Sequence, residues 1–537
     1  MCRRQERGQE RGQEGDPYPA AVPNRDMHRI CRRRDRPVLA ERTARRYLAG
    51  EAWPPVRGAG PAFRSLSVMA AISFLGDLIQ TISDRGRDLI SFGRGDLART
   101  AGAADLAKLC DDLISRRGEA SGVALARLIL DRYASLPLDE RLVFLDLVAG
   151  EFGADHAAVE QAITAYRAEP TRMRLGVLHE AAEPRSQELI RRLNLARGGT
   201  LALVRMREDL FVLRKRLKEQ GASPATLDAA DSLDSDFEHL FASWFNRGFL
   251  VLRHIDWSTP AHILEKIIRY EAVHEIADWD ELRRRIEPPD RRCFAFFHPA
   301  LLDEPLIFVE VALTTAIAPA IQPILAHERE TIAARAATTA IFYSISNCQK
   351  GLAGVTFGNF LIKQVVEDLA REIPSLKTFV TLSPVPGFRT WLDRERRADA
   401  PQGLTREDVE TLRLLDGDAW RDDKAACEAV RRAMLPAAAA YFLRAKNERG
   451  RPLDPVARFH LGNGARLERM NFLGDVSKNG MRQSYGLMVN YLYDLSAIEK
   501  NHETYANLGT VAASSTVSRE LRANLPPPRA VVLAEAG

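Results

Sequence analysis

Residues 349–359 read Gln-Lys-Gly-Leu-Ala-Gly-Val-Thr-Phe-Gly-Asn, and this stretch decides how the fold is interpreted. An apolar run typical of a β-strand precedes it at 339–345. After it, apolar residues recur at 361, 362, 365, 366 and 369, the spacing of an amphipathic helix. A glycine-rich turn between a strand and a helix directs unpaired backbone N–H groups toward one point, where the helix dipole also favours an anion. The stretch therefore predicts a strand, a phosphate-binding loop and a helix.

The glycines of this loop fall as Gln349-x-Gly351-x-x-Gly354. The arrangement resembles the pyrophosphate loop of the acetyltransferase-like (GNAT) fold, although its glycines are spaced differently from the usual Gln/Arg-x-x-Gly-x-Gly/Ala. Taken alone, the loop is read more simply as an ordinary glycine-rich turn. The residues predicted to bind the phosphates of coenzyme A are Gln349, Gly351, Ala353, Gly354, Val355, Thr356, Phe357, Gly358 and Asn359.

Four other blocks carry a more specific resemblance. They are residues 342–346 (Phe-Tyr-Ser-Ile-Ser), 383–388 (Ser-Pro-Val-Pro-Gly-Phe), 457–465 (Ala-Arg-Phe-His-Leu-Gly-Asn-Gly-Ala) and 485–491 (Tyr-Gly-Leu-Met-Val-Asn-Tyr). Together with the loop, they resemble the malonyl-CoA decarboxylase family, in the family's order and over about residues 70–515. The resemblance implies a carboxy-lyase of malonate and fatty acid metabolism that converts malonyl-CoA to acetyl-CoA and CO₂. It also suggests a homotetramer built through the helical domain.

The chemistry of such a reaction defines what to look for in the chain. Loss of CO₂ from a malonyl thioester leaves an electron pair on C2 that the thioester carbonyl accepts, giving an enolate that must then be protonated. This requires a hold on coenzyme A, a polarised carbonyl oxygen and a proton donor near C2, but no metal or organic cofactor. We therefore predict no cofactor.

Two side chains are predicted to carry the reaction. Ser383 precedes a proline, which favours extended backbone and holds the hydroxyl at the end of a strand. His460 lies between Phe459 and Leu461, and imidazole is the side chain that best exchanges a proton near neutral pH. Without the resemblance, a turn serine and a core histidine are the simpler interpretations. The resemblance implies a Ser383–His460 pair that contacts the substrate, with His460 as proton donor and Ser383 as its partner.

Three further residues have lesser expected roles. Asn463 is expected to orient the site, with Tyr491 a second candidate for that role. Thr356 stands where the animal members of the family carry an acidic residue, so a function that depends on this acid is in doubt in this chain. Phosphate binding through backbone N–H groups does not depend on it.

Composition excludes several other classes of protein. The chain has 537 residues, of which 46% are hydrophobic and 28% are charged, as in soluble globular proteins. Its six cysteines are scattered, so neither a metal site nor a disulfide framework is indicated. Residues 1–68 hold 15 arginines, no lysine and 8 acids, so the rest of the chain carries a net charge of about −3 against +4 for the whole. We expect no nucleic-acid partner, and the polar and proline residues at 310–323 argue against a membrane span.

The predicted fold class is α+β, with a helical bundle followed by an acetyltransferase-like catalytic domain. Residues 1–68, with their Gln-Glu-Arg-Gly repeats, form a predicted disordered tail that results from an over-long start assignment, since helical patterning begins after Met69. Residues 69–290 form the helical, oligomerising domain and 291–519 the catalytic domain, with a charged and helical insertion near 395–450. Residues 520–537 form a flexible end.

The expected location is cytoplasmic. The tail is too acidic for a transit peptide, and it lacks the apolar core of a secretory signal. The C-terminal Glu-Ala-Gly is not the peroxisomal Ser-Lys-Leu.

Two other functions stay open from the sequence. A GNAT-type acyltransferase would use the same loop but would need a groove and a base for an amine acceptor. A non-catalytic scaffold that binds coenzyme A would need neither Ser383 nor His460. The two blocks that contain these residues fit the decarboxylase better.

Overall fold

The computed structural model describes residues 102–115, 118–355, 361–399, 401 and 403–522, all of which belong to the second of the chain's two units, residues 77–537. The tail predicted at 1–68 lies outside the described residues. So do loop residues 356–359 and most of the end predicted at 520–537.

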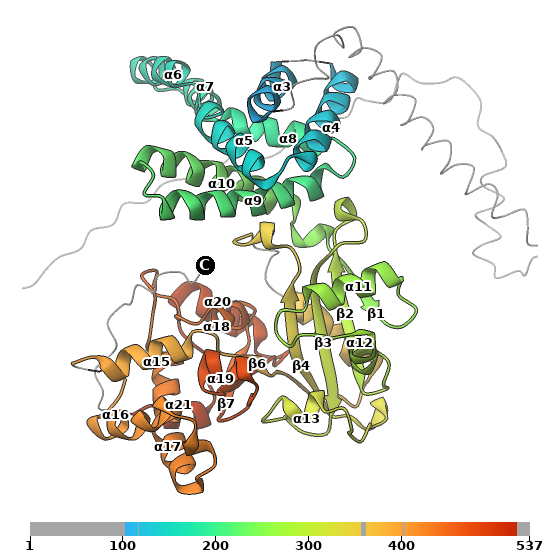
Figure 1. The fold of residues 1–537 in the computed structure, drawn as a ribbon, viewed down its shortest axis with the longest axis vertical. Coiled ribbons are helices and arrows are strands. Elements are labelled where there is room, and N and C mark those ends of the chain that lie inside the picture. The colour runs from blue at the N-terminus through green and yellow to red at the C-terminus, as the bar shows by residue number, and fades with distance from the viewer. Residues whose placement is uncertain (1–101, 116–117, 356–360, 400, 402, 523–537) are drawn as a thin grey trace, which may run out of the picture. The chain divides into compact units, whose positions relative to one another are not determined.

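The described chain begins with helices, shown in blue and green in Figure 1. Ser223 caps the last of these helices before Pro224, because its hydroxyl oxygen accepts a hydrogen bond from the Thr226 N–H at 3.2 Å. Except at residues 156–182, which contribute no buried leucine or phenylalanine, the helices bury leucine and phenylalanine side chains against one another, each burial contributing about 1.5–3 kcal/mol. They are α3 (Ala103–Ser115), α4 (Glu119–Ser135), α5 (Leu138–Glu151), α6 (His156–Ala168), α7 (Arg172–Ala182), α8 (Arg185–Asn194), α9 (Gly199–Glu219) and α10 (Pro224–Trp244).

A mixed sheet follows, and the described residues give it eight strands in the order β1-β2-β3-β4-β5-β8-β6, with β7 paired to β8. Every pair is antiparallel except β4 and β5, which are parallel and joined through helix α14 (Leu361–Glu372). This is the acetyltransferase-like arrangement predicted from the sequence, and the chain is α+β. The strands are β1 (Val251–Ile255), β2 (Arg291–Phe297), β3 (Pro305–Thr314), β4 (Thr339–Asn347), β5 (Thr378–Thr381), β6 (Ser383–Pro384), β7 (Arg466–Asn471) and β8 (Met488–Leu492).

Strand β1 was not predicted, so the sheet begins earlier than the expected change at residue 290. β1 is the outermost strand in the order, and most of its side chains are exposed. Since only one of its residues is buried, its sequence has no apolar alternation, the pattern that identifies a half-buried strand. Strands β2, β3 and β4 are buried almost throughout, which is why their sequences are apolar runs such as the one predicted as a strand at 339–345.

Both faces of the sheet are covered. Alternate residues of β2 illustrate this, since Phe294 and Phe296 join the main core while Cys293 and Phe297 pack with the apolar faces of α11 (Ala261–Tyr270) and α12 (Trp279–Ile286). Figure 1 shows these two helices lying against the β1–β3 part of the sheet. The sheet is therefore a rigid base for residues at its central strands.

The two parallel strands part at the centre of the sheet. β4 and β5 pair from Thr339 with Thr378 to Phe342 with Thr381, and the last bond between them runs from the Leu382 N–H to the Phe342 carbonyl at 2.9 Å. Beyond this bond β4 pairs only with β3, and β6 pairs with β8. A bulge at this point of β4, where the register skips one residue before Ser344, adds to the divergence. An opening between the ends of two parallel strands is a common ligand site.

The C-terminal part adds short helices around strands β5–β8. The segment predicted as an insertion at 395–450 contains two helices, at 406–412 and 424–443, and two 3₁₀ turns. The end predicted from residue 520 begins at the last residue of the final described helix, 515–520. The remaining helices are α13 (Gln322–Leu325), α15 (Phe388–Arg397), α16 (Arg406–Leu412), α17 (Lys424–Leu443), α18 (Pro455–Gly462), α19 (Lys478–Ser484), α20 (Ile498–Leu508) and α21 (Ser515–Glu520).

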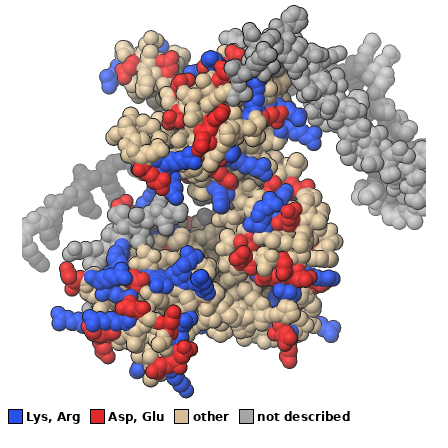
Figure 2. All heavy atoms as spheres, viewed as in Figure 1, with Lys and Arg blue, Asp and Glu red and all other residues tan. Residues whose placement is uncertain are grey.

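Charge and hydropathy of the described part agree with the composition. On the face in Figure 2, lysine and arginine lie among aspartate and glutamate, in keeping with the small net charge of residues 69–537. Within the described residues, no helix combines the length and the apolar character needed to cross a membrane.

Candidate active site

Ser383 lies where the two parallel strands part. It begins β6, pairs with Val489 of β8 and is buried. The following Pro384 restricts Ser383 to extended backbone, so its side chain has a fixed direction. The serine therefore lies at the opening; the sequence placed it at the end of a strand, and in the fold it follows β5 by one residue and begins β6.

His460 comes from helix α18, which follows the divergent strands by about 70 residues in the chain. Asp454 caps this helix, because its carboxylate accepts a hydrogen bond from the Ala457 N–H at 2.8 Å, and Pro455 occupies the first turn. The cap fixes where the helix begins, and this places His460 in its last turn with only 2% of its surface exposed.

The structure brings these two predicted residues together. The Ser383 Oγ atom lies 3.1 Å from His460 Nε2, although 77 positions separate the residues in the chain. The Ser383 O–H donates to Thr381 Oγ1 at 2.8 Å. Because this bond uses the hydroxyl hydrogen, the serine oxygen faces the imidazole as an acceptor, and Nε2 is the ring nitrogen that carries a proton.

Tyr493 completes the hydrogen bonding of the ring. Its hydroxyl lies 2.8 Å from His460 Nδ1, and the residue is buried. With the proton on Nε2, Nδ1 is the acceptor and the phenol donates. The sequence analysis missed Tyr493, although the Tyr-Leu-Tyr pattern at 491–493 places its tyrosines on one face of an extended chain.

Tyr491 and Asn463, the residues expected to orient the site, lie at the face of the His460 ring and at the end of its helix. The Tyr491 ring stacks on His460 with centroids 4.6 Å apart and planes 24° apart, while its buried hydroxyl has no hydrogen-bond partner among the described residues. Asn463 follows the last residue of α18, and its amide donates to the Phe459 carbonyl at 2.8 Å. Tyr491 thus supports the imidazole by its face, and Asn463 secures the end of the helix that carries it.

Burial sets the protonation of the site. It lowers the pKa of His460 to about 3, because a charged imidazolium loses its hydration in this interior. Burial also raises the pKa of Tyr493 well above its ordinary value. At neutral pH the imidazole and the phenol are therefore neutral before substrate binds.

A cavity of about 240 Å³ opens onto the pair. None of its described lining residues is Lys, Arg, Asp or Glu, and most are apolar. The polar groups of its wall include Ser383, His460 and the exposed Asn347. The residues that line it are Val273, Phe342, Tyr343, Ile345, Asn347, Leu382, Ser383, Pro384, Pro455, Val456, Phe459 and His460.

The first half of the predicted phosphate loop makes contacts within the protein. Gln349 donates through its side-chain amide to the Pro305 carbonyl at 3.0 Å, and the Gly351 N–H donates to the Glu208 carboxylate at 3.1 Å. The N–H groups of Leu352, Ala353 and Val355 donate to carbonyls of the same turn. These N–H groups already have acceptors. The phosphate role of residues 349–355 stays a prediction, and Thr356, Phe357, Gly358 and Asn359 lie outside the described residues.

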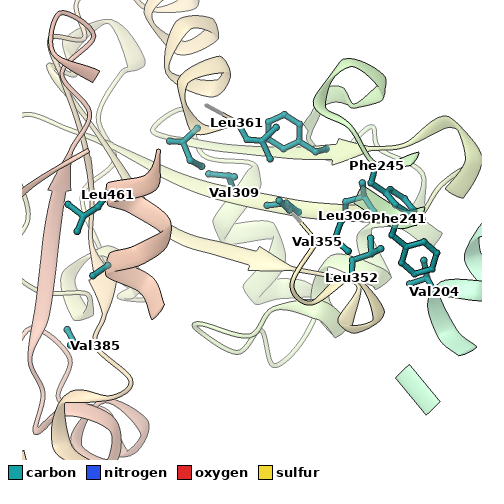
Figure 3. Packing of buried hydrophobic residues seen from close by; sticks show 14 of the residues in the cluster. Val204, Phe241, Phe245, Leu306, Val309, Leu352, Val355, Leu361, Val385 and Leu461 are labelled. Atoms are coloured by element: carbon teal, nitrogen blue, oxygen red, sulfur yellow. The ribbon is translucent and has the colours of Figure 1, made fainter. Parts of the chain in front are cut away.

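Close packing against helix α9 explains why residue 351 of this loop is a glycine. A Cβ atom on Gly351 would lie 1.9 Å from the Val204 carbonyl oxygen, so only glycine permits this approach of the turn to α9. Figure 3 shows Leu352 and Val355 beside Val204 and Phe241 of the helices. The buried Arg207 adds hydrogen bonds from its Nη1 to the carbonyls of Gly351 and Ala353, at 3.1 and 2.9 Å.

Family models match most of the described chain. Residues 152–245 match the malonyl-CoA decarboxylase N-terminal domain, and residues 248–530 match the malonyl-CoA decarboxylase C-terminal domain. The two matches adjoin at the change from helices to sheet.

Relatives and solved structures agree with this match. Mitochondrial malonyl-CoA decarboxylase of Anser anser anser is 34% identical over 409 residues, which are 70% of this chain and 79% of the relative. That of Rattus norvegicus is 33% identical over 408 residues, covering 70% and 81%. The crystal structures of malonyl-CoA decarboxylase from Rhodopseudomonas palustris and Agrobacterium vitis are each 58% identical to this chain and cover 78% of it. Their TM-scores are 0.74 and 0.72, with 99% and 100% of those chains covered.

These comparisons correct the expected location. The curated relatives are named as mitochondrial, so the cytoplasmic prediction is contradicted. That prediction rested on the acids of residues 1–68. A targeting segment needs only a short stretch of suitable composition, so acids elsewhere in the tail do not exclude one.

Proposed function

This chain belongs to the malonyl-CoA decarboxylase family of carboxy-lyases, and we propose that it decarboxylates malonyl-CoA in the cavity that contains Ser383 and His460. The observation that carries the proposal is the 3.1 Å contact between these side chains at an otherwise mostly apolar wall. The volume of about 240 Å³ is of the size of a small acyl group and its thioester rather than a whole coenzyme. The acyl end of the substrate thus occupies the cavity.

The negative charge of the substrate favours the protonated form of His460. Before substrate binds, the imidazole is neutral, because burial lowers the pKa of His460. A malonyl carboxylate in the cavity places a negative charge near the ring in a low-dielectric setting, which favours the imidazolium. The second proton enters at Nδ1, where the Tyr493 oxygen can accept a hydrogen bond as well as donate one.

The proposed reaction then balances without a cofactor. The C–C bond to the carboxylate breaks, CO₂ leaves, and the electron pair moves through C2 onto the thioester oxygen. His460 Nε2 gives its proton to C2, which yields acetyl-CoA and leaves a neutral imidazole with its proton on Nδ1. Uptake of a proton at Nε2 and release of the one on Nδ1 then restore the starting tautomer. Ser383 holds the ring so that Nε2 faces the cavity, a positioning that matters because proton transfer requires contact distance. Over the cycle, one proton from solvent replaces the lost carboxylate.

An incubation of the purified protein with malonyl-CoA alone tests this function. We expect acetyl-CoA and CO₂, and in D₂O an acetyl group that carries one deuterium. Release of free malonate would indicate a hydrolase, and turnover only after addition of an amine would indicate the acyltransferase. Binding of coenzyme A without turnover would indicate the scaffold. His239→Ala, on an exposed position of α10, is the matched control for His460→Ala and should retain full activity.

The helical part supports a proposal about assembly. Helix α7 has no buried residue in the described chain, and its Met173 and Val177, one helical turn apart on the same face, are 70% and 45% exposed. Exposed apolar side chains on one face of a helix are typical of a contact surface. The chain self-associates through this surface, as a tetramer if it follows the family. Light scattering tests this, and Met173→Glu should lower the mass in solution; an unchanged mass would place the interface elsewhere.

A further inference from the structure

Thr381 is a buried polar residue that touches the candidate site from behind. It is the last residue of β5, and none of its surface is exposed. Ser383 lies two positions later, so both side chains project to the same side of an extended segment. Among the described residues that line the cavity, Ser383 is present and Thr381 is not.

The side-chain oxygen of Thr381 accepts two hydrogen bonds. The Ser383 O–H donates to Thr381 Oγ1 at 2.8 Å, and the Tyr491 N–H donates to the same oxygen at 3.1 Å. The second bond anchors Thr381 Oγ1 to strand β8. The Thr381 carbonyl is anchored too, since it accepts from the Asn490 side-chain amide at 2.7 Å. Thr381 Oγ1 is thus an acceptor that strand β8 holds in a fixed position. The same strand contains Tyr491, whose ring stacks on His460.

A fixed acceptor behind a serine determines the direction of its hydroxyl hydrogen. With that hydrogen directed at Thr381, a lone pair of Ser383 Oγ meets His460 Nε2. Only the imidazole tautomer with its proton on Nε2 can satisfy this contact. The other ring nitrogen is then free to accept from Tyr493, which closes a chain of hydrogen bonds with one direction throughout.

We propose that Thr381 is a positioning residue of the decarboxylase reaction, which fixes the rotamer and the hydrogen direction of Ser383 and thereby keeps the His460 proton on Nε2, toward the cavity. This proposal rests on the function proposed above and deepens it. The action of Thr381 passes through Ser383. A merely structural threonine would instead act by satisfying the Tyr491 N–H.

Thr381→Val removes the acceptor and preserves the shape of the side chain. Because loss of alignment at a reacting centre costs up to about 100-fold, we expect kcat to fall by about 10- to 100-fold while KM changes by less than about threefold. Thr381→Ser keeps the hydroxyl and should restore most of kcat. A Ser variant as slow as the Val variant would overturn the proposal, since the methyl group would then be what matters.

The variant Ser383→Ala separates the two roles of Thr381. In that background Thr381→Val should cause no further loss of kcat, because the group through which it acts is absent. An equal loss with and without Ser383 would show a structural role and would refute the proposal.

A crystal structure of Thr381→Val tests the geometry without reference to activity. Ser383 Oγ should leave hydrogen-bonding distance of His460 Nε2. An unchanged contact in the variant would contradict the proposal. Turnover of the wild-type protein on malonyl-CoA is a separate measurement, so an inactive wild type would refute the proposed function and leave the crystallographic test of Thr381 valid.

Discussion

His460 Nδ1 lies 2.8 Å from the hydroxyl of Tyr493, a residue that follows the last position of strand β8. The imidazole is thus held from both nitrogens, by Ser383 on one side and by Tyr493 on the other. A histidine with both nitrogens bonded has a defined tautomer and ring orientation. Its stacking on Tyr491 fixes the plane of the ring as well.

Tyr493→Phe should slow the reaction without weakening the binding of coenzyme A. The phenylalanine fills the same space but leaves Nδ1 without a donor and removes the group that would accept its proton. We expect kcat to fall by about 10²-fold, the lower end of the range for loss of a group in acid–base catalysis. Steady-state kinetics and coenzyme A binding measure the two effects. Tyr166→Phe on α6 is the control, and equal activity of the two variants would exclude Tyr493 from the relay.

The buried histidine also predicts how stability depends on pH. Burial lowers the pKa of His460 to about 3, whereas a histidine in the unfolded chain titrates near 6.5. Between about pH 3 and 6.5 the unfolded state binds more protons, so this residue contributes stability that is present above pH 6.5 and is lost as the pH falls. By pH 5 the loss should be about 2 kcal/mol.

His460→Gln should remove this part of the pH dependence. Urea unfolding at pH 7.5 and pH 5 measures it as the change in unfolding free energy for each protein. Other titrating groups, such as His274, are common to both proteins and cancel in the comparison. The wild type should lose more stability than the variant between the two pH values. A variant with an undiminished pH dependence would show that the imidazole is already charged in the fold.

Arg207 is predicted to hold the helices to the loop. Its guanidinium is buried, donates to Asp234 at 2.7 Å and also binds the carbonyls of Gly351 and Ala353. Arg207→Met leaves these groups without their donor, and loss of one partner of a buried ion pair costs about 3 kcal/mol. We expect a lower urea midpoint and a raised KM for malonyl-CoA, since the displaced turn contains residues predicted to bind the phosphates. Arg205→Met removes a mostly exposed side chain of the same helix and should change neither. Equal effects of both substitutions would contradict this role.

The fold could be predicted from local patterns where burial is complete. The apolar run of β4 and the periodic helix α14 were recognised, since these elements bury a face or both faces. The exposed edge strand β1 left no such pattern and was missed.

The site was predicted only in part, for a physical reason. Ser383 and His460 were named through their resemblance to family motifs, and their contact depends on how α18 packs on the sheet. Tyr493 and Thr381 each lie two residues from the nearest recognised block, 485–491 and 383–388. Tyr493 is tied to the site by its contact with His460, which is distant in the chain, and no local sequence pattern encodes such a contact. Thr381 is tied to the site by its contact with Ser383. Gly351 was interpreted as a phosphate-binding position, whereas its neighbour Val204 lies far away in the chain and is visible only in the fold. Catalytic roles for all these residues stay predictions until they are measured.

The measurement that tests the account most directly is kcat for malonyl-CoA decarboxylation by four proteins: the wild type, Ser383→Ala, His460→Ala and the double variant. Each single substitution should lower kcat by about 10²- to 10⁴-fold, with coenzyme A affinity little changed. If the two side chains act as one unit, the double variant should be far less impaired than the product of the two single losses. Losses that multiply would contradict the Ser383–His460 unit, and near-normal turnover of either single variant would remove that residue from the mechanism.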